Sequence, residues 1–65
     1  MADLPEPTPG RIRAAREASG HSQSAAADVV HVSWRTWQSW EYGARQMPRA
    51  AWELYRLKTG QLSPD

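Results

Sequence analysis

Glycines and helix-capping side chains divide this chain into short segments, and this punctuation constrains the fold more than any other feature. Three glycines follow runs of helix-forming residues, where a left-handed residue ends a helix: Gly20, Gly43 and Gly60. Hydroxyl side chains that can cap a helix precede three of the runs: Thr8, Ser22 and Ser33. We therefore expect four helices, over residues 9–19, from 22 to about 29 or 30, 34–42 and 48–59.

The prolines and the short valine-rich runs fit the same division. Pro9 and Pro48 suit the first turn of a helix, where a missing N–H costs nothing. The runs VV and VHVSW are too short for strands and are framed by caps and stops of helices. The sequence predicts a compact all-α domain over residues 9–60, with a flexible proline-rich tail at 1–8 and a frayed tail at 61–65.

Size and composition bear on what such a domain can do. A chain of 65 residues holds one small core, and the absence of cysteine excludes disulfides and thiol chemistry. No nucleophile–base pair, phosphate loop or metal cluster stands out, and His21 and His31 alone make a poor metal site. We expect no enzyme activity, no catalytic residues, no cofactor and no metal.

The location and the charge of the chain point to an intracellular partner of opposite charge. No apolar run is long enough to span a bilayer, and the first residues carry acid where a secretory signal carries base. All eight basic residues lie within residues 10–60, against four acidic ones, whereas both tails are acidic. A basic compact domain suggests a polyanion as partner.

Two short helices joined by a tight turn are the layout of a helix-turn-helix. The segment from Ile12 to Gly43 resembles the helix-turn-helix of Cro/C1-type phage and bacterial repressors, the XRE family. The matching positions are Arg16, Gly20, Ser22, Gln23, Ala27, Val32, Ser33, Trp40, Glu41 and Gly43. This resemblance implies a lambda-repressor-like four-helix domain that binds double-stranded DNA. His31 departs from the glycine common in the family's turn, where a left-handed residue is wanted, so we expect a slightly remodelled turn.

Helix periodicity separates expected core residues from expected surface residues. Trp37 and Trp40 lie three apart, share one helix face and are interpreted as core, with base stacking as the alternative. Arg16 and Glu41 resemble a partly buried ion pair of the family, which links the first helix to the end of the third. The alternative is two separate solvated charges.

In such folds the third helix enters the major groove, and its first residues meet base edges. The resemblance places five residues there: Ser33, Trp34, Arg35, Gln38 and Ser39. An arginine can donate two hydrogen bonds to guanine, whereas an exposed tryptophan can pack on a thymine methyl, on the sugar-phosphate wall, or over the rim of the core. Three residues match phosphate-contacting positions, and solubilising charge is the alternative for the arginine: Ser22, Gln23 and Arg45.

The last helix is apolar over more than half of its circumference, and repressors of this kind usually bind as two-fold dimers. We expect Trp52 and Tyr55 at a homodimer interface, with Trp52 central and one of the two rings partly exposed. The alternative is that large aromatics complete a thin core.

These features together suggest a sequence-specific DNA-binding transcriptional regulator. The form expected is a dimeric repressor or autorepressor on an inverted-repeat operator, in a phage or mobile-element operon, including the type associated with anti-CRISPR genes. It would lie in the bacterial cytoplasm, bound to the nucleoid through DNA. The alternative is an antitoxin, or another protein-interaction module built on a helix-turn-helix.

Overall fold

A computed structural model describes residues 6–61, and this part of the chain consists of helices, turns and loops without strands. The helices are α1 (Pro9–Ala18), α2 (Gln23–Val29), α3 (Trp34–Glu41) and α4 (Arg49–Lys58). The predicted all-α fold is confirmed, and each helix ends within one residue of its expected range. Among the described helices, none has the length and apolar character needed to cross a membrane.

The helix ends form where the sequence predicts them. Three hydroxyl oxygens each accept a hydrogen bond from the backbone N–H three residues later, at 3.1–3.3 Å, namely those of Thr8, Ser22 and Ser33. Gly20, Gly43 and Gly60 have φ values of 72°, 79° and 74°, a region that glycine enters without a side-chain clash. Pro48 is the N-cap of α4 rather than its first residue, so this helix begins one residue later than expected.

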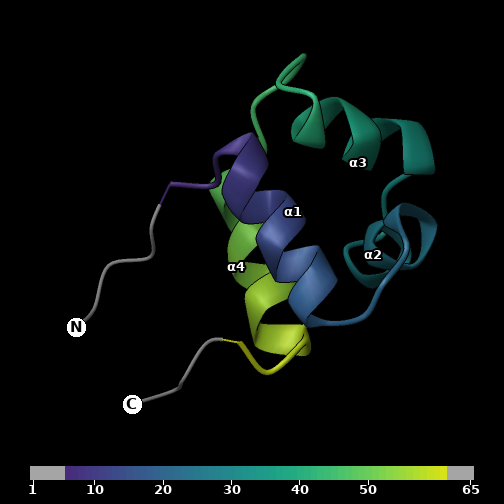
Figure 1. The fold of residues 1–65 in the computed structure, drawn as a ribbon, viewed down its shortest axis with the longest axis vertical. Helices are drawn as coiled ribbons and strands as arrows, with labels where there is room; N and C mark the ends of the chain where they lie inside the picture. The colour runs from purple at the N-terminus through teal and green to yellow at the C-terminus, as the bar shows by residue number, and fades with distance from the viewer. Residues whose placement is uncertain (1–5, 62–65) are drawn as a thin grey trace.

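Helices α2 and α3 form the expected helix-turn-helix, with residues 30–33 as the turn. In Figure 1, α2 is seen almost along its axis while α3 runs across the view. His31 has a φ of 60°, so the turn keeps its left-handed residue although the side chain is not glycine. Lys58 of α4 supports the turn, because its Nζ donates to the carbonyl of Val29 at 3.1 Å and lies 3.2 Å from His31 Nε2.

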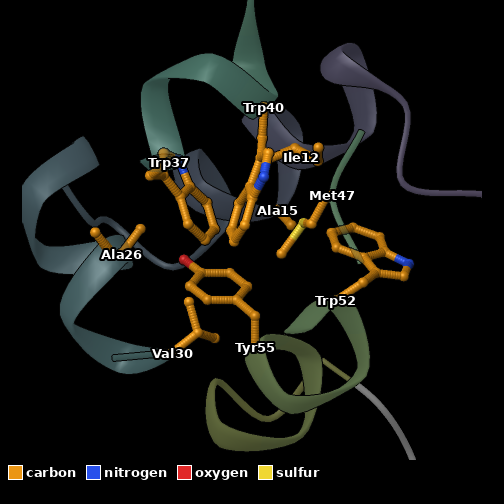
Figure 2. Close-up of a cluster of buried hydrophobic side chains, with 10 residues drawn as sticks. Ile12, Ala15, Ala26, Val30, Trp37, Trp40, Met47, Trp52 and Tyr55 are labelled. Atoms are coloured by element: carbon orange, nitrogen blue, oxygen red, sulfur yellow. The ribbon is translucent and has the colours of Figure 1, made fainter. Parts of the chain in front are cut away.

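The core fills the space between the four helices and is dominated by aromatic rings (Figure 2). Trp37 and Trp40 are both buried, as predicted, with ring centroids 5.7 Å apart. The Tyr55 ring approaches Trp37 to 4.9 Å between centroids. Ala26 and Ala27 are buried on α2, and their small side chains let α2 lie against α3, which carries the large rings.

The assignment of Trp52 and Tyr55 to a dimer interface is wrong. Both side chains are 0% exposed in the isolated chain, so neither ring can reach a partner. Tyr55 closes the core, and its hydroxyl lies 2.9 Å from His21 Nδ1. Trp52 is covered on one side by the Arg56 guanidinium, 5.0 Å from the ring centroid. A chain this short needs both rings to complete its core.

Residues at the inner ends of the two expected tails contact the helices. Pro7 is buried, and the Glu6 carbonyl accepts hydrogen bonds from Thr8 N at 2.8 Å and from Arg11 Nη1 at 3.2 Å. Gln61 Nε2 donates to the Ala15 carbonyl of α1 at 2.9 Å. The rest of the two expected tails lies outside the described residues.

Candidate nucleic-acid interface

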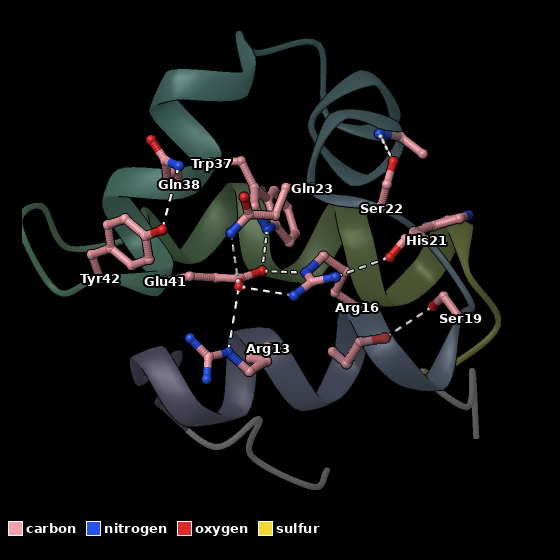
Figure 3. A network of polar contacts seen from close by, with 12 residues as sticks. Arg13, Arg16, Ser19, His21, Ser22, Gln23, Trp37, Gln38, Glu41 and Tyr42 are labelled. Carbon is pink, nitrogen blue, oxygen red and sulfur yellow. Dashed lines mark hydrogen bonds and ion pairs between the residues drawn. The ribbon is translucent and has the colours of Figure 1, made fainter.

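One buried carboxylate joins the helix-turn-helix to α1. Arg16 donates to Glu41 through Nε at 2.5 Å and through Nη2 at 3.2 Å, which confirms the predicted ion pair (Figure 3). The indole N–H of Trp37 donates to Glu41 Oε2 at 2.6 Å, and Gln23 Nε2 donates to Oε1 at 3.2 Å. Arg13 Nε lies 3.6 Å from the same Oε1. The Glu41 side chain therefore contacts α1, α2 and α3 at once.

The electrostatics of this cluster favour an ionised carboxylate. Burial alone acts to raise the pKa of Glu41, but hydrogen bonds from Arg16, Trp37 and Gln23 outweigh it and hold the pKa below its ordinary value. The hydrogen bond to Glu41 raises the pKa of Arg16 in turn. Arg16 also donates through Nη1 to the carbonyl of His21 at 3.1 Å, just before α2. The Arg16–Glu41 pair therefore links the end of α3 to α1 and to the start of α2.

The sequence predicted two members of this cluster but missed the other donors. Trp37 lies four residues before Glu41 on one helix, and Arg13 lies three residues before Arg16 on another. These spacings place each pair on one helix face, so the sequence pattern could have predicted that Trp37 and Arg13 also approach Glu41. Gln23 was assigned only to a phosphate contact. Its amide in fact ties the start of α2 to the end of α3.

The opposite side of α3 faces solvent, and we call its side chains the outer face of α3: Trp34, Arg35, Gln38, Ser39 and the C-cap Tyr42. Trp34 is 45% exposed and Tyr42 is 67% exposed, and Arg35 is exposed as well. Within the described residues of α3 and its two caps, the one acid is Glu41, which points into the core. The outer face of α3 is therefore aromatic and cationic.

Two hydroxyls near the outer face of α3 are already engaged within the helix. Ser33 Oγ caps α3 and lies 2.9 Å from Thr36 Oγ1. Ser39 donates its hydroxyl proton to the Thr36 carbonyl at 2.7 Å, which leaves its oxygen as an acceptor. Gln38 Nε2 donates to the Tyr42 hydroxyl at 3.4 Å (Figure 3), which holds its amide on the outside of the helix. Tyr42 was missed in the sequence, although it lies four residues after Gln38.

The loop after α3 brings a second exposed cation to the same end of the molecule. The backbone N–H groups of Ala44 and Arg45 donate to the Ser39 carbonyl at 2.9 and 3.2 Å. The Arg45 side chain is exposed and borders a hollow of about 280 Å³ with the Glu6–Pro9 segment. Arg49, at the start of α4, lies 3.5 Å from the Glu6 carboxylate. The backbone of Arg45 is thus held beside the end of α3, and its side chain lies in solvent.

The structure groups most of the predicted site residues on the helix-turn-helix. Six lie on α3, at its cap or in the loop that follows: Ser33, Trp34, Arg35, Gln38, Ser39 and Arg45. Ser22 is exposed at the start of α2, next to the half-buried Gln23. Within residues 6–61, no group of histidine and acidic side chains could hold a metal ion.

Comparison with known proteins adds no identification. No protein-family model matches the chain, and no curated protein matches it either.

Proposed function

We propose that this chain is a sequence-specific double-stranded DNA-binding transcriptional regulator in which α3 enters the major groove. The observation that carries the proposal is the outer face of α3, which is free of acid and holds the exposed Arg35 guanidinium beside polar and aromatic side chains. An arginine on such a helix can donate two hydrogen bonds to O6 and N7 of guanine. The Glu41 cluster supports recognition of specific bases, because its hydrogen bonds hold α3 in place from the core side.

Contacts to the DNA backbone complete the proposed interface. The exposed Arg45 would bind a phosphate next to the groove, and the start of α2, at Ser22 and Gln23, would meet the backbone on the other side. Arg49 already faces the Glu6 carboxylate, so a phosphate would have to compete with that contact. These contacts set position and affinity, whereas α3 sets sequence preference.

The proposed biological unit is a homodimer on an inverted repeat, and the proposed role is repression or autorepression of a small phage or mobile-element operon. Two-fold symmetry would place two copies of α3 about one DNA turn apart. Since Trp52 and Tyr55 are buried, the dimer would have to use other side chains of the surface. Leu57 of α4, 55% exposed, is the large apolar candidate on that helix.

A second function has a specific observation in its favour. Tryptophan, tyrosine and arginine are the residues most enriched at the energetic centres of protein interfaces. Trp34, Arg35 and Tyr42 lie exposed on the same helix side, so the outer face of α3 could instead bind a protein, as in an antitoxin. Salt dependence and sequence preference of DNA binding separate the two functions.

The test compares variants of the outer face and of the loop on two duplexes, one enriched by the wild-type chain from a random library and one scrambled. Arg35→Ala should weaken binding to the enriched duplex roughly 5- to 150-fold, the loss of one bidentate base contact, and affect the scrambled duplex much less. Arg45→Ala should weaken both alike and lower the salt slope by about one. Fluorescence anisotropy at two salt concentrations measures the dissociation constant of the wild-type chain and of each variant on each duplex.

Arg11→Gln is the charge control, because Arg11 is exposed on α1 beside Arg56 and Gln61, and a glutamine amide can still donate toward the Glu6 carbonyl that Arg11 contacts. It removes the same charge and should change both affinities less than Arg45→Ala does. Equal losses on the two duplexes for Arg35→Ala would remove the base-reading role of α3. Failure to enrich any duplex would contradict the proposal and favour a protein partner.

A further inference from the structure

Trp34 is unusual among the four tryptophans of the chain because it is not in the core. Trp37, Trp40 and Trp52 are buried, whereas Trp34 is 45% exposed at the first position of α3. Within the described residues its indole N–H has no hydrogen-bond partner. Nearly half of this large apolar ring lies in water at the start of a helix, so that part of its surface is available to a ligand.

The neighbours of Trp34 limit what that ligand can be. Trp34, Gln38 and Tyr42 follow one another at intervals of four residues and so form one row along the helix. The hydrogen bond between Gln38 and Tyr42 shows that these two side chains lean toward each other on the outside (Figure 3). Arg35 is exposed beside this row, and none of the described residues of α3 and its caps is an exposed acid. This surface fits an anionic partner that offers an apolar group to Trp34, in the first turn of α3.

Double-stranded DNA offers one apolar group on its major-groove edge, the C5-methyl group of a pyrimidine. We propose that the Trp34 ring packs on such a methyl group, and that this contact gives the chain a preference for a C5-methylated pyrimidine within its site. The inference rests on the proposed function and names the base chemistry that this site reads. Thymine and 5-methylcytosine carry the same methyl group, so either can supply it.

The test removes single methyl groups from the DNA rather than from the protein. In the enriched duplex each thymine is replaced in turn by deoxyuridine, which keeps the base pair and lacks only the methyl group. At one position the wild-type chain should lose about fourfold in affinity, the factor that corresponds to burying one methyl group. Trp34→Ala should bind the thymine duplex more weakly and show no further loss on deoxyuridine at that position.

Three controls keep the result interpretable. The thermal midpoint of Trp34→Ala should stay close to wild type, because the side chain is outside the core. Trp34→Phe keeps a ring and should retain part of the deoxyuridine effect. A second library with methylated CpG steps identifies the source, since a methyl preference that appears only there assigns it to 5-methylcytosine, and one in the unmethylated library assigns it to thymine.

Three results would overturn the inference while leaving the proposed function intact. The wild-type chain could bind the enriched duplex specifically, tolerate deoxyuridine at every position and show no preference for 5-methylcytosine in the methylated library. Alternatively, Trp34→Ala could lose the same factor on thymine and deoxyuridine duplexes, which would place the ring on the sugar-phosphate wall. Unchanged binding of Trp34→Ala to every duplex would also overturn it and leave the ring to a protein partner. Absence of any specific duplex would remove both proposals.

Discussion

At the scale of single residues, Glu41 has the largest structural effect for its size. Its carboxylate accepts hydrogen bonds from an arginine, an indole and an amide that belong to three different helices. Such buried pairs add little net stability compared with apolar residues, but removing one partner leaves the other charge unpaired. Glu41 therefore matters mainly for how α3 is oriented, and its loss should be severe.

Glu41→Ala should leave the domain largely unfolded at 25 °C. Breaking a buried ion pair costs roughly 3–5 kcal/mol, which is about all that a core in a chain of this size supplies. Glu41→Gln keeps the volume and an acceptor for Trp37, so it should lose less and remain folded at low temperature. Circular dichroism thermal melts measure both, with Glu53→Gln on the exposed side of α4 as control. An unchanged midpoint for Glu41→Ala would contradict the role of the pair.

The lowered pKa of Glu41 gives a pH dependence of defined sign. Because the folded state holds this pKa below the unfolded value of about 4.3, ionisation of the carboxylate stabilises the fold above that pH. The contribution is lost as the pH falls through the folded-state pKa. The free energy of unfolding of the wild-type chain should therefore drop on acidification below about pH 4.3, and Glu41→Gln should show a shallower drop. Parallel curves for the two proteins would contradict this origin.

Residue-level roles were predictable where they follow helix periodicity, as for the buried Trp37 and Trp40. They were not predictable where a side chain has more than one suitable partner. The amide of Gln23 donates to the carboxylate of Glu41, and this contact depends on the three-dimensional arrangement of α2 and α3, which the sequence does not give. Trp52 illustrates a second limit, because α4 is apolar on more sides than the core can cover. Sequence alone does not show which side is turned inward.

At the scale of elements, α2 and α3 form a unit in which small residues face large ones. Ala26 on α2 is 0% exposed, and Trp37 on α3 is its bulky counterpart in the core (Figure 2). Interiors are packed close to crystal density, so extra methylenes at such a position force neighbours from their rotamers. The distance between the two helices is therefore set by the alanines of α2.

Ala26→Leu should lower the free energy of unfolding by about 1–3 kcal/mol, the usual cost of overpacking a core. Ala14→Leu, on the exposed side of α1, adds the same volume and should stay within about 0.5 kcal/mol of wild type. Chemical denaturation measures both values. Equal effects of the two substitutions would show that the α2–α3 contact tolerates expansion, and would contradict the packing described.

Element boundaries were the most predictable feature of this protein, since glycine and hydroxyl residues act locally. The backbone of Gly43 is left-handed and the Ser33 hydroxyl caps α3, both as their positions suggest. The predicted start of α4 at Pro48 was one residue too early, because proline fits both the N-cap and the first turn of a helix. Pro7 is buried, and residues 6–9 line one hollow with the distant loop after α3, an arrangement for which the sequence holds no local signal.

At the scale of the whole molecule, the four helices pack together so that the outer face of α3 is exposed to solvent. The core and the Glu41 cluster lie behind α3, while its outer face presents an arginine, an indole, a phenol and an amide to solvent. The cation of the following loop flanks that face. The proposal that the molecule reads DNA rests on this arrangement, in which one side of α3 packs on the core and the other side is exposed to solvent.

The most direct test of this proposal is a titration of the wild-type chain with two labelled duplexes, the one it enriches from a random library and a scrambled copy, at low and at higher salt. Specific base contacts predict tight binding to the enriched duplex that persists when salt is raised, against weak binding to the scrambled copy that disappears. Weak and equal binding to both duplexes, lost together with added salt, would contradict the account and reduce the outer face of α3 to a charged surface.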